Sequence, residues 1–485
     1  MTSFKEMHGE YIYYDDGKII KIEWYTHDVK DCELDITDGN HSYNHGNEQL
    51  WQKYTLKDGK PDDEWILYHS NGQMSSYREH KGGLKEGIWK AWHDDGSQWD
   101  EQTYVNDKKN GKSKRWRYDE VLEHEGQYKN DKKVGEWIYY YDNGKREYQG
   151  KYKNGKKDDR WINFDESSEK KCGELNYKNG KLDGEYVEFN GDLIILGGQY
   201  KDNKKTGKWI YTSDNGKVGK EENYSNGKLN GNYKEWHPDG KEWKVGNYKD
   251  GKLDGKYVEY HENGPNYLRG LYKSGKKEDK WVYYFDNGKV WKRGTYKNDK
   301  KIDKWTYIHD NGVKSLEENY VNGKLNGKYI SLFYSGVKDE VGTYKNGKKE
   351  GEWNSWYANK IKRKKLFYKN DKLIREKKWD DKEHLVYEFK KDKKLIKYVI
   401  WYRNGQVRSE RVYNSRLDGK YIEHHFNGKK FSSGLIKNDK MHGKWTFWYH
   451  NGKKELEILC KNGKIVEGQV YNDNGTIKKG RAGWA

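Results

Sequence analysis

Aromatic and polar positions alternate along most of the chain, in short runs that end at Asn-Gly or Asp-Gly pairs. In the segment WVYYFDNGKVWKRGTY (residues 281–296), this alternation predicts two strands joined by a turn. Asn-Gly between aromatic runs is typical of a two-residue type I′ turn, in which both central residues have positive φ. No segment has the 3.6-residue period and capping residues of a helix. The pattern therefore predicts an all-β chain built from hairpins.

The hairpins recur as one sequence block, Y-K-N-G-K-x-x-G-x-W. It reads YKNDKKVGEW at Tyr128 and YKNGKKEGEW at Tyr344, and from Tyr200 to Tyr368 the leading tyrosines follow one another in steps of 24 residues. A second turn signal, DNGK or a close variant, lies midway in each block. Internal similarity at such a period is the signature of a repeat architecture. We expect an elongated, twisted, single-layer antiparallel sheet of about twenty hairpin repeats of ~24 residues.

Counting outward from the midway Asn-Gly turns predicts the strand register. Trp281 then lies opposite Gly294, Trp137 opposite Gly150, and Tyr257 opposite Gly270. Large rings cover backbone that a glycine leaves bare, so we expect each ring to lie on the glycine opposite it. The residues expected to hold the repeats together in this way are Trp137, Gly150, Trp209, Tyr257, Gly270, Trp281, Gly294, Trp305, Trp353 and Trp445.

The composition fits a thin sheet better than a thick core or a disordered chain. Only 32% of residues are apolar and 36% are charged, but the chain has 22 Trp and 44 Tyr, and disordered chains are poor in aromatic residues. The start lacks the apolar core of a signal peptide, and no window is apolar enough for a transmembrane helix. Cys32, Cys172 and Cys460 lie far apart without a CxxC motif. These features predict a cytoplasmic, reducing compartment.

The block YKNGKKEGEW followed by YxNGK resembles the MORN-variant repeat (membrane occupation and recognition nexus), in the form found in bacterial antitoxin-type proteins. The resemblance covers most of the chain, from about residue 9 to residue 475. It implies a non-enzymatic hairpin scaffold, and scaffolding and membrane-associated roles are both found in the family. The tight G-x-G of the better-known MORN repeat is mostly absent here.

Variation in the repeat divides the chain into five predicted segments. Residues 1–22 form an N-terminal cap or partial repeat, and residues 23–53 are divergent. Regular MORN-like repeats occupy residues 54–359, degenerate and strongly basic repeats residues 360–412, and C-terminal repeats with a cap residues 413–485.

Two histidine pairs are candidate metal ligands. His41 and His45 are four residues apart in the divergent segment, and His424 and His425 are adjacent. A metal site needs three or four ligands, and adjacent strand residues point to opposite faces. We therefore expect polar side chains at these positions and no metal.

The most basic part of the chain is the run from Lys360 to Ile400, with 16 Lys and Arg against 7 Asp and Glu. One interpretation is a worn repeat with solvated lysines; the other is a basic patch for anionic lipid, nucleic acid or an acidic partner. The patch would consist of Lys360, Lys362, Arg363, Lys364, Lys365, Lys377, Lys378, Lys390, Lys391, Lys393 and Lys394.

Catalytic motifs are absent from the sequence: there is no GxSxG, Walker loop, HExxH or Rossmann GxGxxG after a strand. We therefore predict no enzymatic activity, no cofactor and no small-molecule substrate. The predicted function is a scaffold for protein–protein interaction, with toxin neutralisation as one form of it. The alternative is attachment to anionic membrane surfaces through a basic face. Glycan binding by aromatic rows ranks below both, and nucleic acid is disfavoured because the positive charge is spread over turns.

Overall fold

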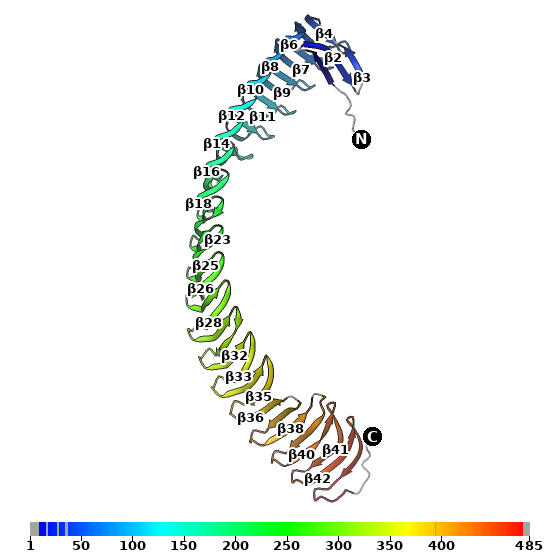
Figure 1. Cartoon of the computed structure of the whole chain (residues 1–485), viewed down its shortest axis with the longest axis vertical. Helices are drawn as coiled ribbons and strands as arrows, with labels where there is room; N and C mark the ends of the chain where they lie inside the picture. Colours follow the sequence, from blue (N-terminus) through cyan, green and yellow to red (C-terminus); the bar gives the residue numbers. More distant parts are fainter. Residues whose placement is uncertain are drawn as a thin grey trace. The chain divides into compact units, whose positions relative to one another are not determined.

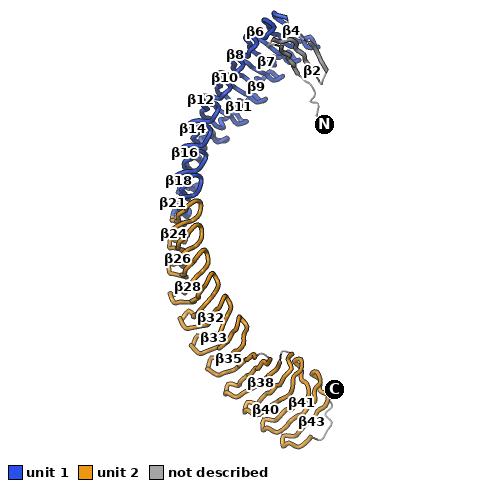
Figure 2. The backbone as a smooth tube through the Cα atoms, viewed as in Figure 1, with its two compact units in different colours: residues 1–240 blue, residues 241–485 orange. Residues whose placement is uncertain are grey.

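The computed structural model describes residues 9–15, 18–26, 29–33, 37–392, 394–414 and 416–478, with side chains from residue 37 onward. All its helix and strand elements are strands, so this part of the chain is all-β and without helices, as predicted. The chain divides into two compact units, residues 1–240 and 241–485, which Figure 2 shows in separate colours.

The first unit holds a small N-terminal sheet and a long one. The small sheet consists of β1 (Gly9–Asp15), β2 (Lys18–Thr26) and β3 (Val29–Glu33) in that order. The long sheet consists of β4 (Gly39–Asn44), β5 (Leu50–Lys57), β6 (Lys60–Tyr68), β7 (Met74–Lys81), β8 (Leu84–Trp92), β9 (Gln98–Val105), β10 (Lys108–Trp116), β11 (Leu122–Lys129), β12 (Lys132–Tyr140), β13 (Arg146–Lys153), β14 (Lys156–Phe164), β15 (Lys171–Lys178), β16 (Lys181–Asn190), β17 (Leu193–Lys201), β18 (Lys204–Thr212), β19 (Val218–Ser225), β20 (Lys228–Leu229) and β21 (Gly231–Trp236).

The second unit continues the same pattern of hairpins. Its strands are β22 (Glu242–Lys249), β23 (Lys252–Leu253), β24 (Gly255–Tyr260), β25 (Asn266–Lys273), β26 (Lys276–Tyr284), β27 (Val290–Lys297), β28 (Lys300–Ile308), β29 (Lys314–Val321), β30 (Lys324–Leu325), β31 (Gly327–Leu332), β32 (Lys338–Lys345), β33 (Lys348–Trp356), β34 (Lys362–Lys369), β35 (Lys372–Trp379), β36 (Leu385–Lys391), β37 (Ile396–Trp401), β38 (Val407–Tyr413), β39 (Gly419–His424), β40 (Lys430–Lys437), β41 (Lys440–Trp448), β42 (Lys454–Lys461) and β43 (Lys464–Val470).

Within each unit the strands follow one another in chain order as an open, single-layer antiparallel sheet (Figure 1). Long strands in the interior of a sheet pair with a neighbour on each side, as β26 does with β25 and β27, whereas β3 and β4 belong to separate sheets. The predicted fold of antiparallel hairpin repeats is therefore confirmed.

The turns at the two ends of a hairpin differ. Asn322 and Gly323 have φ of 49° and 80° and separate the paired residues Val321 and Lys324, which is the two-residue type I′ geometry. The midway turn at Asn287 is different, since Phe285 donates its N–H to the carbonyl of Lys289 at 2.8 Å and leaves three residues in the loop. The prediction of a type I′ turn at the midway position was therefore wrong.

A bulge after each midway turn restores the predicted register. Tyr284 pairs with Val290, whereas Tyr283 pairs with Lys292, so Trp291 is an extra residue in its strand. Beyond this bulge Trp281 lies opposite Gly294, as predicted from the sequence. The bulge therefore compensates for the longer turn.

The midway asparagines are explained by hydrogen bonding rather than by backbone conformation. The Asn311 carboxamide oxygen accepts the N–H of Val313 at 2.9 Å, and its amide nitrogen donates to the carbonyl of Tyr334 in the next midway turn at 2.9 Å. Asn263 makes the same inter-turn bond to the carbonyl of Asp286 at 2.8 Å. Asn311 thus closes its own turn and ties it to the following hairpin, whereas Asn263 makes only the tie, because the residue two positions on is proline and has no N–H.

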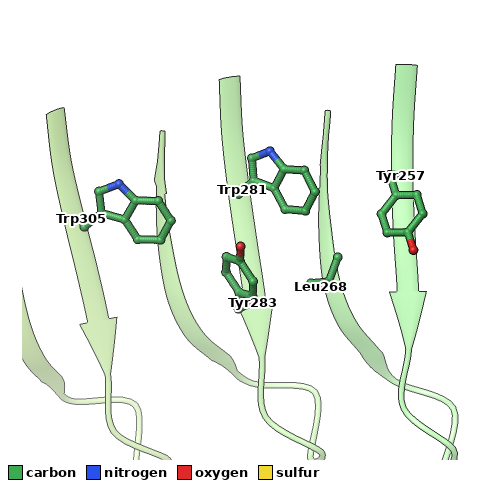
Figure 3. Packing of buried hydrophobic residues seen from close by; sticks show 5 residues of the cluster. All are labelled: Tyr257, Leu268, Trp281, Tyr283 and Trp305. Carbon is green, nitrogen blue, oxygen red and sulfur yellow. The ribbon is translucent and has the colours of Figure 1, made fainter. Parts of the chain in front are cut away.

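The core of the sheet includes a row of buried tryptophans, and among the described residues seven of these rings each lie on a glycine. An added Cβ at Gly294 would be 2.2 Å from the Trp305 ring, and one at Gly270 would be 2.2 Å from the Trp281 ring. Trp281 and Trp305 are 0% exposed although only one layer of sheet is present (Figure 3). The rings therefore fill the space that a side chain on the glycine would need.

The ring covers the glycine of the preceding strand, not the following one. Gly150 is paired with both Trp137 and Trp161, but it is Trp161 that lies 2.3 Å from its added Cβ. Likewise Gly270 carries Trp281, whereas Tyr257 lies on Gly246. The expectation that Trp137 covers Gly150, Tyr257 covers Gly270 and Trp281 covers Gly294 was therefore wrong, although these residues do face one another.

A backbone carbonyl that the bulge releases from the strand ladder explains why each ring lies on the glycine of the preceding strand. Gly150 pairs with Trp161, but the next residue, Lys151, pairs with Asp158, so two residues of β14 bulge out. Asp159, in this bulge, has a φ of 65°. The carbonyl of Lys151 accepts the indole N–H of Trp161 at 3.1 Å. The same hydrogen bond orients Trp137, Trp209, Trp281, Trp305, Trp353 and Trp445.

A lysine covers the other side of most of these rings, whereas Met441 packs against Trp445. Lys277 Nζ lies 4.3 Å from the Trp281 ring centroid and donates to the Tyr283 hydroxyl at 3.1 Å. Burial lowers the pKa of the Lys277 ammonium. Lys157 and Lys349 lie 4.0 and 3.8 Å from the rings of Trp161 and Trp353. The second lysine of the NGKK turn is thus a packing residue, and such cation–π contacts are stabilising.

Candidate binding surface

Strand alternation gives the sheet two faces with different chemistry. The tryptophan face bears Trp281 and Tyr283, and the charged face bears Lys280 and Val282 from the same strand. The bulge turns Trp291 towards Phe285, with ring centroids 6.3 Å apart, and Lys292 Nζ lies over both Trp291 and Tyr283. Trp291 therefore belongs with the tryptophan face and not, as alternation alone predicts, with the charged face.

The charged face is largely neutralised by ion pairs between neighbouring strands. Lys208 Nζ lies 2.7 Å from a Glu221 carboxylate oxygen, and Lys304 Nζ 3.1 Å from Glu317. Further pairs of this kind are Lys90–Glu101, Lys114–Glu125, Arg160–Glu174, Lys365–Glu352, Lys377–Glu388, Lys397–Glu410 and Lys444–Glu457. Each exposed pair contributes little stability, about 0–1 kcal/mol, but the row leaves little net charge on this face.

Residues just before the midway turns form a ladder along one edge of the sheet. His45 Nε2 bonds the carbonyl of Tyr68 at 2.9 Å, and His425 Nε2 bonds that of Trp448 at 2.8 Å. Tyrosine takes the same role at Tyr402, whose hydroxyl donates to the carbonyl of His424 at 3.0 Å. These bonds span 22 or 23 residues and join a hairpin to the next one.

This ladder assigns a structural role to two of the candidate metal ligands. His45 and His425 bond backbone carbonyls, and His41 Nε2 lies 2.6 Å from the carbonyl of Thr37. Burial, and then the charge of Lys430, lowers the pKa of His424. Among the described residues no group of three or more His, Cys, Asp or Glu side chains is arranged to hold a metal ion.

A different histidine is half-buried among rings of the tryptophan face. The His80 ring lies 6.0 Å from the Trp65 ring and 5.1 Å from the Trp89 ring. Burial, followed by the charges of Arg78 and Lys85, lowers the pKa of His80 to about 4. His80 is therefore neutral near pH 7 and packs as a ring.

The predicted basic patch is divided between the two faces. Lys365 and Lys377 lie opposite each other on the charged face, and Lys390 follows opposite Arg375. Lys365 Nζ is 3.0 Å from Glu352, and Lys377 Nζ is 3.5 Å from Glu388. These three lysines share one surface, where acidic neighbours neutralise two of them.

Other members of the patch point elsewhere. Lys364 and Lys378 lie opposite each other on the tryptophan face, and Lys378 Nζ is 3.3 Å from Glu376. Arg363 pairs with Asp339 at 3.5 Å, and Lys362 Nζ lies 5.9 Å from the Trp379 ring centroid.

The remaining members lie at strand ends. Lys360, with a φ of 71°, lines a cleft of about 450 Å³ with Lys338 and Trp356. Lys391 ends β36, Lys394 lies in the loop after it, and Lys393 is outside the described residues. A binding role for the patch stays a prediction.

Comparison with known families bears on what the repeats are. The model of the MORN repeat variant matches residues 133–154, 280–298, 349–380 and 441–462. The chain carries MORN-variant repeats. Each matched segment includes a midway turn and the strands beside it, and the match at residues 349–380 also includes the two-residue turn that follows, so the MORN-variant match and the observed hairpins coincide. The resemblance predicted from the sequence is confirmed.

Other comparisons add little to the MORN-variant match. No curated protein matches the chain. It aligns over 90% of its length, at 9% identity and a TM-score of 0.15, with 28% of a chain in the crystal structure of TcdB2-TccC3-TEV. A chain of the Photorhabdus luminescens Tc holotoxin pore aligns at 10% identity and a TM-score of 0.14 over 24% of its length. The protein thus spans about a quarter of these chains, and similarity this weak supports no functional conclusion.

Since the described part of the chain contains strands and no helices, it offers no helix long and apolar enough to cross a bilayer.

Proposed function

We propose that this MORN-variant protein is a non-enzymatic cytoplasmic scaffold that binds an elongated partner protein along its hairpin repeats. A toxin that it neutralises would be one partner of this kind. The observation that carries the proposal is the exposed row Lys256, Lys280, Lys304 and Lys328 on the charged face, one residue for each hairpin. Two strands per hairpin space such residues at about 10 Å. A regular row suits a partner with regularly spaced groups.

The ladders along the edges support the proposal because they fix neighbouring hairpins relative to one another. His309 bonds the carbonyl of Leu332, and Asn311 bonds that of Tyr334, at the midway edge. At the opposite edge Gly323 donates its N–H to the carbonyl of Lys301 at 2.9 Å. A row that is already ordered loses less entropy when it binds a partner.

A protein partner is favoured over a membrane by the distribution of charge. Lys365 and Lys377 lie on the charged face, whereas Lys364 and Lys378 lie on the tryptophan face. A flat anionic bilayer attracts cations that face it together, each contributing about 1 kcal/mol. Lysines divided between two faces cannot all approach one bilayer surface.

The test is affinity capture of the full chain from native lysate, with lysine-reactive cross-linking and mass spectrometry. The control is the variant W209A/W281A/W305A, which lacks three core rings and in which the rows lose their spacing. We expect one protein to be enriched by the wild type alone, with cross-links over three or more consecutive hairpins. Equal capture by both chains, or cross-links confined to one hairpin, would refute the proposal.

A further inference from the structure

One stretch of the charged face departs from the pattern of internal ion pairs. In strands β24 to β27 this face bears Lys256, Arg269, Lys280 and Arg293, all exposed. None of these four forms an ion pair with another described residue, whereas the next cation of the row, Lys304, pairs with Glu317 at 3.1 Å. The four cations are called the open basic cluster below.

The acidic residues on the same strands do not neutralise this cluster. Glu259 accepts a hydrogen bond from the Tyr257 hydroxyl at 2.6 Å on the tryptophan face. Glu278 accepts the backbone N–H of Asn298 at 2.8 Å at the edge of the sheet. Asp279 and Asp303 lie in strand bulges, with φ of 58° and 54°, and neither forms an ion pair. The positive charge of the cluster is therefore left for a partner.

The register fixes how the cations are spaced. Arg269 pairs with Val282, and Val282 pairs with Arg293, so two strand spacings of about 4.8 Å separate the arginines. Lys280 is two residues from Val282 along the strand, or about 7 Å. The cluster is therefore a grid of cations around the apolar side chain of Val282. Carboxylates at alternate positions of an extended peptide are also about 7 Å apart, which matches the spacing of the cations along the strand direction.

We infer that the open basic cluster binds an acidic segment of the partner protein, an inference that rests on the proposed scaffold function. At Arg160–Glu174 and Lys208–Glu221 on this face, the chain's own glutamates occupy the cations. The partner's carboxylates take that place at the cluster. Arginine favours such a ligand because its planar guanidinium binds a carboxylate through two parallel hydrogen bonds.

Two other anionic partners fit this surface less well. Stacking of nucleic-acid bases needs free rings, but Tyr284, the ring nearest Arg269, is 9% exposed and lies 5.7 Å beneath the guanidinium carbon of Arg269. A membrane contact needs a wide positive surface, and the cluster ends at Glu317 within two strands of Arg293.

The test uses a fluorescent twelve-residue peptide of alternating Glu and Thr, with binding to the full chain measured by anisotropy. The variant R269Q/R293Q removes two charges from the cluster, and the matched control R160Q/K208Q removes two from cations that already have partners. Exposed surface substitutions of this kind leave the fold intact. We expect R269Q/R293Q to weaken binding at least about tenfold and the control to change it less than about twofold.

Vesicles of phosphatidylserine and phosphatidylcholine, and single-stranded oligo-dT, serve as competing probes at the same salt concentration. Equal loss in both variants, or tighter binding of vesicles or oligo-dT than of the peptide, would overturn the inference. If R269Q/R293Q binds the peptide normally while native lysate still yields a partner cross-linked along the repeats, the inference fails and the scaffold function stands.

Discussion

Gly197 and Gly198 are adjacent in β17, and the core packing predicts opposite effects when each is changed to alanine. Neither has a positive φ, so alanine is compatible with both backbones. An added Cβ at Gly197 has only Ile194 nearby, at 3.9 Å. An added Cβ at Gly198 lies 2.2 Å from the Trp209 ring, and Trp209 is 0% exposed.

The magnitude follows from these distances. Carbon atoms pack at about 3.5–4.0 Å, so the Trp209 ring must move by more than about 1 Å in G198A. Such overpacking costs about 1–3 kcal/mol. The shift also loosens the bond from Trp209 Nε1 to the carbonyl of Gln199, now 3.2 Å, which contributes about 1 kcal/mol. G198A should therefore lower local stability by about 2–3 kcal/mol, whereas G197A should raise it by about 0.4–1 kcal/mol through the unfolded chain.

Native-state hydrogen exchange of β17 and β18 measures these changes, because it reports the free energy of local opening in a chain of many repeats. The double variant G198A/W209A gives the decisive comparison. Removal of the ring costs about 3–5 kcal/mol by itself, but it leaves room for the new methyl group. The penalty of G198A should then disappear in the W209A background. An unchanged penalty there, or equal effects of G197A and G198A in the wild type, would refute the packing of ring on glycine.

Three further substitutions test other parts of the structure. K277Q removes the cation over Trp281 and should cost about 0.5–2 kcal/mol by hydrogen exchange of β26, whereas K276Q, at the exposed neighbouring position, should change stability by less than about 0.5 kcal/mol. N311G should destabilise the midway turn by about 1–3 kcal/mol because it removes two hydrogen bonds. N322G should be nearly neutral, because the role of Asn322 is to adopt a φ of 49°, which glycine adopts equally well. Similar losses of stability in both variants would contradict the distinction between the turns. The folded pKa of His80, about 4, lies below its unfolded value near 6.5, so its contribution is complete above pH 6.5 and is lost as the pH falls towards 4. The stability difference between wild type and H80Q, from urea midpoints, should shrink by at most about 3 kcal/mol between pH 7 and pH 4, and a constant difference would contradict the burial of neutral His80.

The sequence was sufficient for the hairpins and their register because turn residues and alternating rings recur at a fixed period. Trp281 faces Gly294 as counted from Asn287, even though the turn there has three loop residues. The count succeeded because the bulge at Trp291 adds one residue where the longer turn shifts the pairing by one. Asn-Gly alone could not distinguish the turns, since asparagine supports both a positive φ and a hydrogen bond to the next hairpin.

The side on which each ring lies could not be derived from register. Gly150 has a tryptophan opposite it on both neighbouring strands, and the choice depends on the bulge at Asp159 that frees the carbonyl of Lys151. A sequence signal did exist for the edge ladder, because His45 and His69, which both bond the next hairpin, are 24 residues apart before midway turns.

The charge content of segments of the sequence likewise did not locate the candidate site. The run from residue 360 to residue 400 is the most basic in the sequence, but strand alternation and ion pairs such as Lys365–Glu352 divide and neutralise it. The open basic cluster has only four cations and is not conspicuous in composition. The cluster is defined by the neighbours of each cation on the same face: Arg269 and Arg293 both lie beside the apolar Val282 and not beside a carboxylate.

The most direct test of partner docking on the open basic cluster is a charge-swap experiment with the partner protein once it has been captured. Its affinity is measured for the wild type, for R269E/R293E, and for R269E/R293E combined with a partner whose acidic segment carries arginine in place of glutamate. We expect binding to be lost in the second case and largely restored in the third, because the ion pairs are re-formed with reversed polarity. Binding that is unaffected by R269E/R293E, or a loss that the exchanged partner does not restore, would contradict docking of a partner on this surface.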